Sequence, residues 1–198
     1  MSKKKVIIIG PAFPFRGGIA NFNNALAKAY HDRGDEVVLY SFTLQYPSFL
    51  FPGTTQYESG QPPKDLKIKT LINSVNPLNW IKVARKINRE NPDYVIIRYW
   101  LPFMAPCLGT IARLLNKKIK ILAITDNVIP HEKRIGDTLF TRYFVKSCTA
   151  FLSLSAAVLD DLSKFTTTTY KKFIPHPIYD VFGDKISKKK AIENLGLN

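Results

Sequence analysis

The chain has 198 residues, 45% of them hydrophobic, with no short repeat or low-complexity tract. This composition fits one globular domain with a substantial core. Two cysteines, Cys107 and Cys148, are too few for a disulfide scaffold or a metal knuckle, and we expect free thiols. The net charge of +14 favours an anionic partner, such as nucleic acid, phospholipid head groups or a nucleotide, without choosing between them.

The amino-terminal apolar run stops at Gly10 and Pro11, which makes it too short for a signal peptide. No later segment approaches the length of a membrane-spanning helix. We therefore predict a cytoplasmic protein, with peripheral attachment at the inner face of the membrane as a further possibility.

Short, apolar, β-branched runs recur along the chain, and most of them are continuously apolar, which is typical of strands covered on both faces. They span residues 5–9, 36–42, 66–71, 93–99, 118–124, 150–155 and 171–174. Helix-like segments lie between them, at 17–34, 76–91, 102–116, 136–148 and 155–165. This alternation predicts an α/β fold, a doubly wound, mostly parallel, Rossmann-like sheet of about seven strands.

Two of the helices carry local signals. In the first, spacing places Ile19, Phe22, Leu26 and Ala29 on the core-facing side. The second opens with Asn76 as the N-cap, followed by a proline at the first helical position. The connection 43–64 is rich in proline and aromatic residues and is unusually long, which is typical of a functional loop.

The turn after the first strand is a candidate phosphate site. A dinucleotide fingerprint fits poorly, because Gly10 and Gly17 are too far apart and no acid ends the second strand. A Walker A loop fails because no GK[ST] follows. The pair Gly17 and Gly18 would let backbone amides approach an oxyanion at a helix amino terminus. Equally, these glycines could only permit the turn.

Three segments carry a resemblance to a known family: PFRGGIANFNNALAKAYHDRGDEVVLYSF, ILAITDNVIPHEKR, and LSLSAAVLDDL followed by KFIPHPIYDVFG. Their order and spacing resemble the N-terminal domain of GT-B glycosyltransferases of family four, in its glycosyl transferase 4-like subgroup. The resemblance implies a nucleotide-sugar donor, such as a UDP- or GDP-sugar, held between two domains. It places Gly17 and Gly18 against the donor phosphates and sugar, with Arg16 beside them.

The second segment implies further site residues. Many relatives have His-Asn or His-Asp where this chain has Asp126 and Asn127. By resemblance Asp126 is the candidate catalytic group, which stabilises positive charge or positions the sugar; a simple Asx turn is the alternative. His131 and Glu132 could bind substrate or only bond one another. Arg98 is a candidate phosphate contact, with a plain salt bridge as the alternative.

Together these predictions imply one geometry. Gly17 and Asp126 should meet at the same edge of a single parallel sheet and form one wall of a crevice. The resemblance also implies a retaining transfer without a metal ion or other cofactor, to a glycan or lipid-linked acceptor in surface polysaccharide or glycolipid synthesis. We expect residues 1–182 to form the acceptor-side domain and 183–198 to begin a linker or tail. The donor-binding second domain is missing, so we expect this chain alone to be inactive.

Relatives often work at a membrane, and helix 77–90 offers basic residues for an anionic surface: Lys82, Arg85, Lys86 and Arg89, with Trp80 near its start. The long loop adds Tyr46, Phe49, Leu50 and Phe51. Two other functions are alternatives. A nucleic-acid-binding module has no recognisable motif here, so no nucleic acid partner is expected. A dinucleotide-dependent oxidoreductase is disfavoured by the missing acid.

Overall fold

The computed structural model describes residues 2–47, 56–130, 132, 134–177 and 185–197. Seven strands form one sheet in the order β3-β2-β1-β4-β5-β6-β7, and every neighbouring pair is parallel. The strands are β1 (Lys5–Ile9), β2 (Glu36–Leu44), β3 (Lys67–Asn73), β4 (Tyr94–Tyr99), β5 (Lys120–Thr125), β6 (Ala150–Ser153) and β7 (Lys171–Phe173). The predicted doubly wound parallel fold is confirmed.

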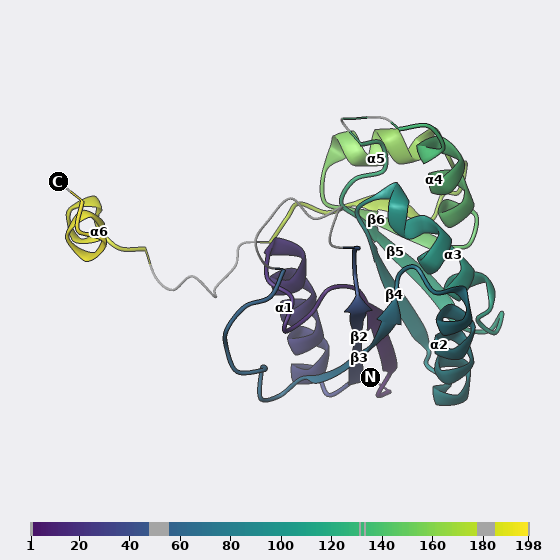
Figure 1. Cartoon of the computed structure of the whole chain (residues 1–198), viewed down its shortest axis with the longest axis horizontal. Helices are drawn as coiled ribbons and strands as arrows, with labels where there is room; N and C mark the ends of the chain where they lie inside the picture. Colours follow the sequence, from purple (N-terminus) through teal and green to yellow (C-terminus); the bar gives the residue numbers. More distant parts are fainter. Residues whose placement is uncertain (1, 48–55, 131, 133, 178–184, 198) are drawn as a thin grey trace.

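Helices cover both faces of this sheet, as Figure 1 shows with α1 on one side and α2 and α3 on the other. Their bounds are α1 (Gly18–Asp32), α2 (Pro77–Glu90), a short 3-10 helix η2 (Pro102–Met104), α3 (Ala105–Arg113), α4 (Asp137–Val145), α5 (Ala156–Ser163) and α6 (Lys188–Leu195). Each parallel crossover brings the chain back to the same edge of the sheet. All seven strands therefore end at one edge, called here the carboxyl edge.

Strand β1 lies at the centre of the core because it is buried on both faces. Val6 and Ile8 pack in the layer beneath α1, while Ile7 and Ile9 pack in the layer beneath α2 to α5. All four side chains are inaccessible to solvent. Full burial of such a side chain contributes about 1.5–3 kcal/mol. The continuously apolar sequence is thus explained by a sheet that is covered on both sides.

The start of α2 agrees with its sequence signal. The Asn76 side chain accepts hydrogen bonds from the amides of Leu78 at 3.0 Å and Asn79 at 3.2 Å, and Pro77 occupies the first turn. An N-cap of this kind contributes about 1 kcal/mol to stability. It fixes where the crossover from β3 turns back along the sheet.

The prediction for the buried face of α1 is partly wrong. Phe22 is buried, but Ala29 is exposed. The residues that α1 buries are Ala20, Phe22, Asn23 and Ala27. The buried stripe is therefore rotated relative to the apolar pattern, because it includes Asn23, a polar residue that an apolar count cannot place in the core.

The segment 183–198, predicted to begin a linker or tail, contains α6. Its Ser187 side chain accepts a hydrogen bond from the Lys190 amide at 3.3 Å, and Gly196 ends it in the left-handed conformation. Both signals are readable in the sequence. Helix α6 buries no residue and lies apart from the sheet (Figure 1).

Within the described ranges, no helix combines the length and the apolar character that crossing a membrane requires. Cys107 and Cys148 are both free, as predicted.

Candidate active site at the carboxyl edge

The carboxyl edge brings together the segments that follow β1, β4 and β5. The turn 10–17 follows β1 and leads into α1, and Asp126 follows β5 directly. The Asp126 amide donates to the Tyr99 carbonyl at 2.9 Å, which continues the β4–β5 ladder. Two inter-strand spacings separate β1 from β5, so these strand ends lie about 10 Å apart. The expected shared edge for Gly17 and Asp126 is therefore present.

Gly17 forms the bend that starts α1. Its φ is +114° and its ψ is 171°, a region that is essentially restricted to glycine. A Cβ at Gly17 would meet nothing within 4 Å, so the constraint is backbone conformation and not crowding. Helix α1 begins without a side-chain N-cap hydrogen bond. Gly17, Gly18 and Arg16 are all exposed there.

Arg98 and Asp126 form the central pair of the site. The Arg98 Nε donates to Asp126 Oδ2 at 2.5 Å, and its Nη2 donates to Oδ1. The Arg98 side chain is 2% exposed and that of Asp126 is 21% exposed. The guanidinium also lies 4.1 Å from the centre of the Phe22 ring of α1. The pair is neutral overall, and Phe22 connects it to the first turns of the helix.

A tight contact with β1 holds this arrangement in place. A Cβ at Gly10 would lie 2.5 Å from Asn23 Nδ2 and 3.0 Å from the Arg98 Cβ, so only glycine fits there. Asn23 Nδ2 donates to the Pro11 carbonyl at 2.8 Å. Asn23 Oδ1 and Arg98 Nη1 are buried without a hydrogen-bond partner among the described residues. Such atoms call for a bound water or a ligand atom.

The electrostatics of Asp126 follow from its position. Burial raises the pKa of its carboxyl above the ordinary value, while the hydrogen bonds and charge of Arg98 act in the opposite direction. A smaller opposing contribution comes from the charge of His176. Because both carboxylate oxygens accept from Arg98, the group suits positioning or charge stabilisation better than proton abstraction.

Sequence reasoning missed three residues of this site: Phe22, Asn23 and His176. The His176 ring lies 5.6 Å from the Phe22 ring in an edge-on arrangement. Asn23 had a signal, since it is a polar residue beside an apolar helix stripe. His176 had none, because it lies 154 positions after Phe22 in the chain (176 − 22) and only the fold brings the two together.

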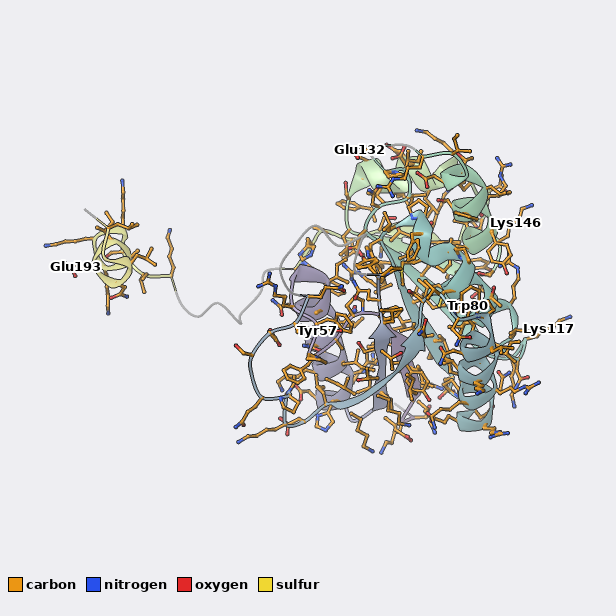
Figure 2. All side chains as sticks on the ribbon, in the orientation of Figure 1. Tyr57, Trp80, Lys117, Glu132, Lys146 and Glu193 are labelled. Atoms are coloured by element: carbon orange, nitrogen blue, oxygen red, sulfur yellow. The ribbon has the colours of Figure 1, made fainter. Side chains whose placement is uncertain are left out.

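Three predicted site residues remain, namely Asn127, Glu132 and His131. Asn127 is partly buried beside Asp126. Glu132 is exposed in the connection between β5 and α4, where it is labelled in Figure 2. His131 lies outside the described residues, so its expected interaction with Glu132 stays a prediction.

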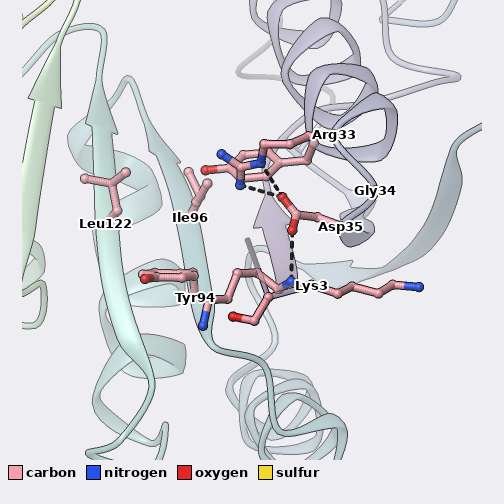
Figure 3. Close-up of a pocket in the computed structure, with 10 residues that line it drawn as sticks. Lys3, Arg33, Gly34, Asp35, Tyr94, Ile96 and Leu122 are labelled. Atoms are coloured by element: carbon pink, nitrogen blue, oxygen red, sulfur yellow. Dashed lines mark hydrogen bonds and ion pairs between the residues drawn. The ribbon is translucent and has the colours of Figure 1, made fainter.

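A cavity of about 650 Å³ lies at the opposite, amino edge of the sheet (Figure 3). Tyr30, Tyr94, Ile96 and Leu122 provide its apolar walls. Asp35 lies at its rim, where it accepts a hydrogen bond from the Lys4 amide at 2.8 Å and another from Arg33 Nε at 2.7 Å. None of the predicted site residues lines this cavity, so it is separate from the site at the carboxyl edge.

No group of three or more His, Cys, Asp or Glu side chains that could hold a metal ion occurs in the part of the chain that the structure describes. The cationic and polar groups at the carboxyl edge suit an anionic ligand. They comprise the start of α1, the buried Arg98 and the exposed Arg16.

Comparison with known proteins agrees with this geometry. The sequence profile of Glycosyltransferase Family 4 matches residues 16–177. No curated protein sequence matches the chain significantly.

Among solved structures, a UDP-N-acetylglucosamine 2-epimerase from Rickettsia bellii has a TM-score of 0.59 at 13% identity, over 99% of this chain and 52% of its own. A putative UDP-N-acetylglucosamine 2-epimerase from Listeria monocytogenes has a TM-score of 0.56 at 13% identity, over 86% and 45%. An alpha-glucosyltransferase in complex with UDP and a 13-mer DNA containing an HMU base has a TM-score of 0.55 at 11% identity, over 86% and 42%. The chain thus spans about half the length of the structures that it resembles, and these likenesses show the fold.

Proposed function

Because the chain belongs to Glycosyltransferase Family 4, we propose that it is the N-terminal, acceptor-side half of a retaining glycosyltransferase. The enzyme would transfer a sugar from a nucleotide-sugar donor to a glycan or lipid-linked acceptor, in the synthesis of a surface polysaccharide or glycolipid. The observation that carries this proposal is that the Gly17 bend and the Arg98–Asp126 pair lie at the same edge of the sheet.

In this proposal the donor phosphates lie against the start of α1. Gly17 and Gly18 present backbone there without intervening side chains, and the helix dipole favours negative charge. Arg16 is exposed beside them and adds a cation. Arg98 acts from below, where its buried guanidinium orients the Asp126 carboxylate.

Asp126 would then face the reacting sugar. Its partly exposed carboxylate is held by two hydrogen bonds, so it is already oriented before the substrate binds. A preorganised negative group can stabilise the positive charge that develops at the anomeric carbon. Asn127 follows it directly and is assigned to substrate binding, as are Glu132 and His131.

The donor class is supported by the structural neighbours. The alpha-glucosyltransferase contains UDP, and both epimerases are named for a UDP-sugar. We therefore choose UDP as the first probe, with GDP as the second.

The test is nuclear magnetic resonance of the 15N-labelled chain during titration with UDP, GDP and NAD. We expect UDP or GDP to shift the amide signals of Gly17 and Gly18, while NAD leaves them unchanged. Gly18→Ala is the matched variant, because a Cβ there meets nothing within 4 Å and so disturbs only the approach of a ligand. If NAD alone shifts these signals, the oxidoreductase alternative replaces the proposal.

We further propose that residues 1–182 form the acceptor-side domain and that this chain alone does not catalyse sugar transfer. The chain covers 42–52% of three solved structures of its fold, and the family resemblance assigns most donor contacts to a second domain. The assay incubates the pure chain with labelled UDP- and GDP-sugars and candidate acceptors. Sustained product formation would contradict the inactivity of the isolated half.

We also propose that the exposed basic face of α2 contacts an anionic membrane surface. Lys82, Arg85 and Arg89 are exposed, and Leu78 at the start of the helix is 70% exposed. Trp80 contributes less than expected, because it is partly buried and its Nε1 donates to the Asn73 carbonyl at 2.8 Å. Tyr46 is likewise bonded to Trp100, and Phe49, Leu50 and Phe51 lie outside the described residues.

Co-sedimentation with phosphatidylglycerol-containing vesicles tests this contact. Each basic residue near an anionic surface contributes about 1 kcal/mol, so reversing Lys82, Arg85 and Arg89 to glutamate should abolish most binding. Binding of the parent chain that is equal on neutral vesicles would rule out the electrostatic contact. Competition with duplex DNA separates the membrane from a nucleic acid partner, which we do not expect.

A further inference from the structure

The cavity at the amino edge is large enough for a small-molecule ligand. Its volume of about 650 Å³ lies within the range of roughly 300–1,000 Å³ that is usual for ligand sites. Its floor belongs to the layer beneath α1, and none of the residues assigned to substrate binding lines it. A ligand in this cavity would therefore occupy a second site, separate from the carboxyl edge.

Strands β4 and β5 supply an apolar floor to this cavity. Ile96 and Leu122 are direct partners in the parallel register, and Tyr94 lies two positions before Ile96 on the same face of β4. Ile96 is buried, whereas Leu122 and Tyr94 keep part of their surface accessible. Figure 3 shows these three side chains projecting into the same space. With the half-buried Tyr30 of α1 as a further wall, the apolar part of a ligand would meet both aliphatic and aromatic groups.

The charged residues of the cavity are mostly cationic. Lys3, Lys4 and Arg33 line it, and Asp35 is the one acidic residue among its described lining. The Asp35 side chain is buried, and its two oxygens accept hydrogen bonds from the Lys4 amide and from Arg33, as the dashed lines in Figure 3 mark. The hydrogen bonds of this carboxylate are therefore already made within the chain, and the cavity presents positive charge to a ligand.

The three cations differ in how far they are already engaged. Arg33 is bonded to Asp35, and its Cζ lies 4.8 Å from the centre of the Tyr30 ring. The Lys4 ammonium lies 3.7 Å from an Asp93 oxygen. The Lys3 side chain is exposed and has no ion-pair partner among the described residues. An anionic group at the mouth of the cavity would therefore meet a cation that no described carboxylate neutralises.

We propose that this cavity binds a small organic anion, whose apolar body lies on Ile96 and Leu122 and whose anionic group meets Lys3. Fatty acids and aromatic carboxylates or sulfonates share this chemistry. The inference is independent of the proposed function, because the two sites have no residue in common. A second copy of the chain suits the cavity less well, since each copy carries a net charge of +14.

Two probes with similar ring systems provide the direct test on the 15N-labelled full chain. Anilinonaphthalene sulfonate is an aromatic anion, and phenylnaphthylamine is its neutral counterpart. The sulfonate should shift the amide signals of Tyr94 and Leu122 saturably and leave those of Gly17 and Gly18 unchanged. We expect it to bind roughly twofold to fivefold more tightly than the neutral probe, with a smaller difference at high salt. The same titration with decanoate distinguishes an aliphatic from an aromatic ligand by which anion binds more tightly. Equal affinity of the two ring probes, or cavity signals that stay unchanged with both anions, overturns the inference.

Three variants locate the bound anion. Leu122→Glu places a carboxylate on the floor of the cavity, so we expect affinity for the sulfonate to fall by roughly tenfold or more. Leu139→Glu is the matched control, because Leu139 is 66% exposed on α4 and away from the cavity, and it should keep the affinity of the parent chain. Lys3→Glu changes an exposed residue outside the strands, which leaves the core intact, and should weaken binding roughly twofold to fivefold.

Unchanged affinity of Lys3→Glu would show that the anionic group does not meet this cation, and an equal loss in Leu139→Glu would show that the probe binds elsewhere. Sedimentation velocity of the parent chain and of Leu122→Glu tests the competing occupant. If the parent chain self-associates and Leu122→Glu does not, a second copy covers the cavity and the inference is wrong.

Discussion

The two edges of the sheet each hold an arginine–aspartate pair, and the pairs are built in opposite ways. At the carboxyl edge the arginine is buried and the carboxylate is partly exposed, with 2% and 21% of their side chains accessible. At the amino edge Arg33 is 56% exposed and the Asp35 carboxylate is 5% exposed. The first pair joins two strands 28 positions apart, and the second joins neighbours in one turn.

This difference distinguishes the candidate site from a structural clip. A buried cation that holds an accessible carboxylate presents an oriented negative group to a ligand, next to glycines and a helix amino terminus. A buried carboxylate that is held by a surface arginine and the Lys4 amide presents only the arginine, and it fastens the amino end of β1 to the turn after α1. The cavity of about 650 Å³ lies at the clip, whereas the Gly17 bend and the Arg98–Asp126 pair lie at the other edge.

The largest effect should come from breaking the carboxyl-edge pair. Asp126→Ala leaves the buried Arg98 without its partner, so we expect the free energy of unfolding to fall by about 3–5 kcal/mol. Urea denaturation of the purified variants measures it. The double variant Arg98→Met/Asp126→Leu should recover most of the loss, because an apolar pair of similar volume replaces both charges. A mild effect of Asp126→Ala would mean that the pair is solvated and weak.

The glycine bend should give the next largest effect. Gly17→Ala places a side chain in a backbone region that is essentially restricted to glycine, at a cost of about 1–3 kcal/mol. Gly18→Ala is the matched control, since Gly18 lies in the helix with an ordinary φ and a Cβ there is unobstructed. It should be neutral or stabilising by up to about 1 kcal/mol. Thermal unfolding of the two variants side by side provides the comparison, and equal losses would refute the backbone explanation.

At the amino edge the effect should depend on pH. The hydrogen bond from the Lys4 amide and the Arg33 side chain lower the pKa of Asp35 below its ordinary value of 3.8, against a smaller opposing effect of burial. This carboxylate therefore stabilises the fold fully above about pH 5, and the contribution is lost as the pH falls through the lowered pKa. Asp35→Asn should reduce stability near pH 7 and converge with the parent chain at low pH.

Asp160→Asn, an exposed substitution on α5, is the control for that series. It should follow the parent chain at every pH. A stability difference for Asp35→Asn that is constant with pH would show that the charge of Asp35 has no role.

The smallest effect should follow removal of the exposed arginine. Arg33→Ala eliminates a pair whose cation is 56% exposed, so we expect at most about 1 kcal/mol, and less at high salt. Chemical denaturation at low and high ionic strength measures it. If Arg33→Ala lowers the free energy of unfolding as much as Asp126→Ala does, the proposed difference between the two edges is wrong.

Much of the fold was predictable because its signals are local or periodic. Apolar runs identified all seven strands, and the central ones are continuously apolar because strands buried on both faces of a parallel sheet need such sequences. Asn76 and Pro77 marked the start of α2 correctly. Helix α6 was missed although Ser187 and Gly196 carry the same kind of signal, and the error at Ala29 came from counting apolar residues alone.

By itself the sequence determined that the strands are parallel, and hence that Gly17 and Asp126 lie at one edge. Only the tertiary structure decided which other side chains lie next to Asp126 at that edge. Arg98 meets Asp126, Phe22 covers Arg98, and His176 returns from the last strand, because crossovers and the strand order set those distances and spacing along the chain does not. Periodicity reports which face a residue occupies, whereas charge pairing depends on which strand ends become neighbours.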